Sequence, residues 1–129
     1  MKKKYLIVIA DYYEEISKGL LESALKNIPK SNFIKVIKVP GVFEIPVILS
    51  KNIKNYDAFL ALGCVIKGQT PHFDFISSAT TNAIMELSVK NKKPIGNGII
   101  TCLNMRQAIA RKKKGKEAAK AVISVLSQK

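Results

Sequence analysis

The only histidine of the chain, His72, lies in a segment whose composition suits proton transfer beside an anion. A histidine ordinarily titrates near pH ~6.5, so its imidazole can donate and accept protons at neutral pH. Gly68, Gln69 and Thr70 precede it, and such residues ahead of a helix can offer backbone N–H groups and a hydroxyl to a phosphate. A structural histidine and a plain turn are the alternatives. We predict that Gly63–Phe75 (GCVIKGQTPHFDF) is an active-site loop in which His72 handles the proton.

Three other places carry side chains suited to a ligand. Arg111 opens the run RKKKGK, and its planar guanidinium could grip a phosphate, unless this run is a solvated helix face. Glu44 follows Phe43 at an expected helix start, where a carboxylate either caps the helix or accepts from ligand hydroxyls. Tyr12 and Tyr13 end the first strand, where one ring could stack on a planar heterocycle while the other packs in the core.

Several signatures of other enzyme classes are missing. No Gly-x-Gly-x-x-Gly follows the first strand, and there is no nucleophile elbow. Cys64 and Cys102 lack metal-ligand spacing, so we expect no metal site and two buried free thiols, with a single disulfide as the alternative. A proton shuttle, anion contacts and an aromatic ring suit addition, elimination or condensation on a small phosphorylated substrate.

A scaffold must bring these residues together, and strand and helix patterns alternate along all 129 residues. This alternation predicts one α/β domain over 1–129, a three-layer α/β/α sandwich with a mainly parallel four-stranded sheet. Ligands in such sheets bind outside the carboxyl ends of the strands, where the candidate residues fall. Periodicity predicts strands at 5–10, 33–39, 58–66 and 94–101, and helices at 14–27, 43–54, 76–91 and 104–126, the last divided near Gly115.

The net charge of +13, from 22 basic and 9 acidic residues, raises the question of a polyanionic partner. The lysines are mostly scattered, and no zinc finger, aromatic–basic RNA signature or basic zipper accompanies them. The first apolar run is too short for a bilayer span or a secretory signal. We therefore expect a cytoplasmic protein that binds no nucleic acid and no membrane, and whose basic surface attracts anionic substrates.

Three segments resemble the signature regions of the 6,7-dimethyl-8-ribityllumazine synthase family: VPGVFEIPVIL (39–49), ALGCVIKGQTPHFDFI (61–76) and IGNGIIT (95–101). The resemblance extends from Leu6 to about Leu126, in the same order and spacing. It implies a flavodoxin-like fold and the condensation of 5-amino-6-(D-ribitylamino)uracil with 3,4-dihydroxy-2-butanone 4-phosphate, with loss of phosphate and water. It implies no metal or organic cofactor. It also implies a pentamer or a higher assembly of pentamers with active sites between subunits, and an association with riboflavin synthase.

The resemblance assigns a role to each matching residue. His72 matches the proton donor. The contacts to the butanone phosphate would be Gln69, Thr70, Arg111 and Lys114. The contacts to the aminouracil would be Tyr12, Val42, Phe43, Glu44, Cys64, Val65, Ile66 and Asn97.

This chain departs from the family pattern in three places. Asp11-Tyr12-Tyr13 stands where the family commonly has Arg-Phe-Asn, so a stacking ring remains but a positive charge is lost. Asn97 occupies a position that is often aromatic. The stretch after Arg111 is shorter than usual, which leaves the role of Lys114 open. These departures motivate an alternative function, a non-catalytic shell protein that binds lumazines or flavins.

Overall fold

Four strands form one parallel sheet in the computed structural model, which describes residues 2–128. The order is β2-β1-β3-β4, and every pairing among these strands is parallel. The central strands lie in register, so that Ile7 stands between Val36 and Leu60. The strands are β1 (Lys4–Ala10), β2 (Phe33–Val39), β3 (Ala58–Ile66) and β4 (Ile95–Cys102).

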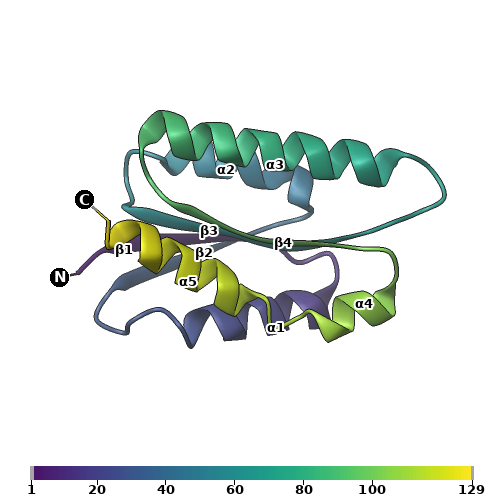
Figure 1. Cartoon of the computed structure of the whole chain (residues 1–129), viewed down its shortest axis with the longest axis horizontal. Helices are drawn as coiled ribbons and strands as arrows, with labels where there is room; N and C mark the ends of the chain where they lie inside the picture. Colours follow the sequence, from purple (N-terminus) through teal and green to yellow (C-terminus); the bar gives the residue numbers. More distant parts are fainter. Residues whose placement is uncertain (1, 129) are drawn as a thin grey trace.

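Helices cover both faces of this sheet, which confirms the predicted three-layer α/β/α sandwich (Figure 1). One face carries α1 (Glu14–Leu25), α4 (Met105–Ala110) and α5 (Gly115–Leu126). The other face carries α2 (Ile45–Asn52) and α3 (His72–Asn91). Among residues 2–128, no helix has the length and apolar character needed to cross a membrane.

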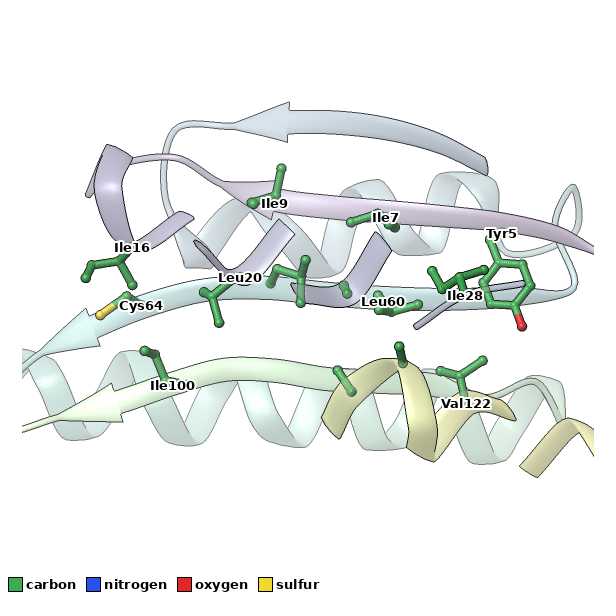
Figure 2. Close-up of a cluster of buried hydrophobic side chains, with 14 of the residues drawn as sticks. Tyr5, Ile7, Ile9, Ile16, Leu20, Ile28, Leu60, Cys64, Ile100 and Val122 are labelled. Carbon is green, nitrogen blue, oxygen red and sulfur yellow. The ribbon is translucent and has the colours of Figure 1, made fainter. Parts of the chain in front are cut away.

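The core is two apolar clusters separated by the sheet. Ile7 and Ile9 of β1 join the cluster beneath α1 and α5, whereas Leu6 and Val8 join the cluster beneath α2 and α3. A strand buried on both faces reads as a continuous apolar run, which is why β1 and β3 were recognisable in the sequence. Figure 2 shows the first cluster, with Cys64 at the carboxyl end of the strands.

The predicted element boundaries hold to within two residues, with two corrections. The expected helix over 43–54 is a 3₁₀ turn, Val42–Glu44, followed by α2, with Pro46 in the first turn, where its missing N–H costs nothing. The helix expected from Ile76 begins four residues earlier, at His72, because Pro71 can take the position before the first helical residue. Gly63–Phe75 is therefore the end of β3, a short connection and the first turn of α3.

Two glycines let α5 approach the rest of the domain. A Cβ at Gly96 would meet the carbonyl oxygen of Ala118, and a Cβ at Gly115 would meet the carbonyl oxygen of Leu20 in α1. Gly96 lies in β4, so its missing side chain lets the main chain of α5 come close to the sheet. Gly115 also divides the long C-terminal helical segment near the predicted point, with α4 ending at Ala110 and α5 beginning at Gly115.

We expect Gly115→Ala to destabilise the protein by about 1–3 kcal/mol, because the added methyl group overpacks the contact between α5 and α1. Urea unfolding at fixed protein concentration measures the destabilisation. Gly68→Ala is the matched control, since a Cβ at Gly68 has no atom within 4 Å. Equal unfolding free energies for the two variants would contradict this account.

Candidate active site

Seven of the predicted site residues line one cleft of about 370 Å³. It lies at the carboxyl ends of β1, β2 and β3, the position expected for a ligand site in a parallel sheet. The cleft combines aromatic rings and an imidazole with the end of β3. The predicted residues are Tyr12, Val42, Phe43, Cys64, Val65, Ile66 and His72, and Tyr13, Gly41 and Ile76 complete the lining.

The connection after β3 places His72 in the lining of this cleft. The N–H of Lys67 donates to the carbonyl of Cys102 at 2.9 Å, which extends the ladder between β3 and β4 by one residue. The chain then turns, and the N–H groups of Asp74 and Phe75 donate to the carbonyl of Pro71. His72 is thus the first residue of a 20-residue helix, exposed, with its N–H directed to the hydroxyl of Thr70 at 3.4 Å.

Three predicted contacts lie beside the cleft rather than in its lining. Gln69 and Thr70 are exposed on the short connection. Glu44 is partly buried, and its carboxylate accepts the N–H of Gly41 at 2.9 Å, so the capping role considered from sequence is present. This hydrogen bond uses one carboxylate oxygen and holds the turn that presents Val42 and Phe43 to the cleft.

Cys64 contributes a neutral thiol to the cleft wall. Burial, with a further contribution from the neighbouring Cys102, raises its pKa from the ordinary 9.0 to about 12. Both cysteines are free and buried, as predicted. Since the thiolate is the nucleophilic form, Cys64 is poorly suited to covalent catalysis at neutral pH.

The remaining predicted residues line a second cleft of about 350 Å³, formed by β4 and the start of α5. Arg111 lies over the end of β4, where its Nη1 donates to the carbonyl of Thr101 at 3.4 Å. Lys114 pairs with Glu117 at 2.7 Å. The side-chain oxygen of the exposed Asn97 accepts the N–H of Ile99 at 3.0 Å, so its amide NH₂ group remains as a donor. Each of these four side chains lines the cleft.

The two clefts of one chain share no lining residue. The first offers rings and an imidazole, and the second offers cations for a phosphate. Asn97 is expected from the resemblance among the ring contacts, but within one chain it lies in the same cleft as Arg111 and Lys114. Tyr13, expected either to stack or to pack in the core, also lines the first cleft. Glu117 lines the second cleft without an expected role, and its position three residues after Lys114 was the available signal.

No other part of residues 2–128 offers a comparable set of groups. No cluster of three or more histidine, cysteine or acidic side chains within that range could hold a metal ion. A larger hollow of about 580 Å³ lies between α1 and the turn before α5, and its side chains are lysines, carboxylates and small polar groups. It brings together no imidazole and no aromatic ring, so the candidate chemistry belongs to the two clefts.

Comparison with known proteins agrees with this geometry. Residues 2–129 match the model of the family described as 6,7-dimethyl-8-ribityllumazine synthase. A protein of that name from Cutibacterium acnes is 40% identical over 133 residues, covering 96% of this chain and 80% of its own. 6,7-dimethyl-8-ribityllumazine synthase 1 of Rhodopseudomonas palustris is 41% identical over 136 residues, covering 95% and 83%. The protein of that name from Bartonella tribocorum is 40% identical over 140 residues, covering 100% and 93%.

The match spans both clefts and every strand that positions them, and the flavodoxin-like arrangement of the sheet and helices is the one that the sequence resemblance implied. This chain belongs to the 6,7-dimethyl-8-ribityllumazine synthase family.

Proposed function

We propose that this protein is a 6,7-dimethyl-8-ribityllumazine synthase, a transferase of riboflavin biosynthesis. The observation that carries the proposal is the family match over residues 2–129, together with relatives of that name at about 40% identity over most of the chain. The reaction condenses 5-amino-6-(D-ribitylamino)uracil with 3,4-dihydroxy-2-butanone 4-phosphate. The amine attacks the ketone and water leaves to give an imine, phosphate is then eliminated, and ring closure releases a second water.

We assign the substrates to the two clefts by their chemistry. The aminouracil stacks on Tyr12 in the first cleft, beside Val42, Phe43 and the end of β3. Glu44 accepts from ribityl hydroxyls with the carboxylate oxygen that Gly41 does not use. His72 moves the protons of imine formation and elimination, which its exposure at the start of α3 supports.

The phosphate of the ketone needs cations, and the second cleft supplies them. Arg111 offers a planar fork for the phosphate, with Lys114 as a point charge beside it. Gln69, Thr70 and the N-terminus of α3 lie on the side of His72 and favour the same anion. Asn97 offers an amide donor to the ring.

The separation of the clefts supports a site shared between subunits, in which His72 and Tyr12 of one chain meet Arg111, Lys114 and Asn97 of the next. The outward face of α3 supports an assembly as well, because exposed apolar side chains recur along it. They are Phe75, Met85 and Val89. We propose a cyclic pentamer, alone or in a larger assembly.

We place the protein in the cytoplasm, a location that the two free, buried cysteines favour. An association with riboflavin synthase, the enzyme class that consumes the lumazine, belongs to the same proposal and rests on the family resemblance.

The direct test is to mix the protein with both substrates and to follow lumazine fluorescence and phosphate release. We expect both signals, and we expect His72→Ala to lower kcat by about 10²- to 10⁴-fold, because general acid–base help is typically worth that much. Thermal unfolding should change little, since His72 is exposed. Lys51→Ala is the matched control, because Lys51 lies near the C-terminal end of α2 and lines neither cleft. Lumazine binding without turnover in the unsubstituted protein would favour the shell-protein alternative.

Arg111→Ala should raise KM for the butanone phosphate by about 10- to 100-fold, the cost of losing a charge-assisted hydrogen bond. Mixing this variant with His72→Ala tests the shared site. If the clefts meet across subunits, refolding the two variants together at equal amounts restores about one quarter of the sites in a cyclic ring. Activity no greater than the sum of the separate variants would place both residues in the same subunit's site.

The proposed reaction uses no thiolate, and burial should keep the Cys64 thiol protonated. At pH 8 we expect iodoacetamide to alkylate Cys64 of a Cys102→Ala protein much more slowly than an ordinary thiol, because burial, the largest cause of the raised pKa, remains in that variant and keeps the thiolate fraction low. Cys102→Ala removes the second thiol, and the same variant in guanidinium chloride supplies the reference rate. Equal rates in the folded and unfolded protein would show that Cys64 is a reactive thiol.

A further inference from the structure

Tyr13 lies against the ring of Tyr12 in the first cleft. The two ring centroids are 4.9 Å apart and the planes stand at 86°, an edge-to-face arrangement that favours attraction between aromatic rings. Tyr12 is 75% exposed, whereas Tyr13 is half-buried and packs on the core cluster beneath α1. The inner ring is therefore held by the core, and the outer ring rests on it.

The backbone on both sides of these rings is fixed. The N–H of Asp11 donates to the carbonyl of Val39 at 3.2 Å, which ties the end of β1 to β2. The hydroxyl of Ser17, itself buried, donates to the carbonyl of Ala10 at 2.7 Å, and its N–H donates to the carbonyl of Tyr13 at 2.9 Å. With the main chain held, the remaining freedom of Tyr12 is rotation of its side chain.

An exposed ring that rotates freely loses that freedom when it stacks on a ligand, and the loss weakens binding. A neighbouring ring that already restricts the rotation removes part of this cost before the ligand arrives. Within the turn, Tyr13 is the group whose ring contacts Tyr12. Burial raises the pKa of the Tyr13 phenol, so that it stays neutral and compatible with its apolar setting.

We propose that Tyr13 is a positioning residue that holds the exposed ring of Tyr12 in the orientation that stacks on a planar pyrimidine. The inference deepens the proposed function, because it specifies what sets affinity for the ring-bearing substrate. The ring of Tyr13 carries this role, and its hydroxyl is not required for the contact.

A double-mutant cycle tests the inference. Tyr13→Leu should weaken binding of the lumazine product, measured by fluorescence titration, by about two- to tenfold, the usual range for an aromatic pair. KM for the aminouracil should rise by the same factor, while KM for the butanone phosphate stays within twofold. Tyr13→Phe should restore most of the affinity. In a Tyr12→Leu background, Tyr13→Leu should cost nothing further, because its effect passes through Tyr12.

A merely structural role would give another pattern. Tyr56→Leu removes a second edge-to-face pair, with Phe59 at 6.2 Å, outside the cleft lining, and should change stability alone. If Tyr13→Leu does not fold, Tyr13→Met fills the same space with a flexible apolar chain. An unchanged lumazine Kd, or an equal loss in the Tyr12→Leu background, would overturn the inference. Because lumazine binding needs no turnover, an inactive protein would refute the proposed function while leaving this test valid.

Discussion

The position of β3 between β1 and β4 is the constraint on which both clefts depend. β3 is buried on both faces through Gly63 and carries the chain to the sheet edge, where Cys64, Val65 and Ile66 become cleft wall. Its pairing with β4 sets where Thr101, and with it Arg111, lies at that edge. A slip of one residue would turn every side chain of β3 to the other face, so the two apolar clusters also fix the site.

Much of this arrangement could be predicted from sequence, because the signals were strong and local. Apolar runs such as AFLALGCVI gave the buried strands with their observed limits, and alternation with helices gave a parallel sheet. A parallel sheet places all carboxyl strand ends on one side, so the sequence alone predicts that Tyr12, Phe43 and His72 lie together, as they do. The same reasoning predicts that one of Tyr12 and Tyr13 is exposed and the other is packed, but it does not tell which of the two is exposed.

The rest depended on geometry that no local pattern specifies. The helix predicted from Ile76 begins at His72 instead. The polar residues around His72 are typical of a loop, and Pro71 is compatible both with a loop and with the position before a helix. The capping bond of Glu44 depends on the conformation of a single turn. The separation of Asn97 and Arg111 from the aromatic cleft follows from their places in β4 and directly after α4. Tyr12 and Asn97, both expected to contact the aminouracil, therefore lie in different clefts of one chain.

The direction of the strands has a consequence for engineering. β1 begins at Lys4 and α5 ends at Leu126, and in Figure 1 the start of β1 and the end of α5 lie on the side of the molecule opposite to the start of α3. Polypeptides joined to either end would thus emerge away from the cleft of the chain that carries them. The fold is a suitable carrier for displayed peptides.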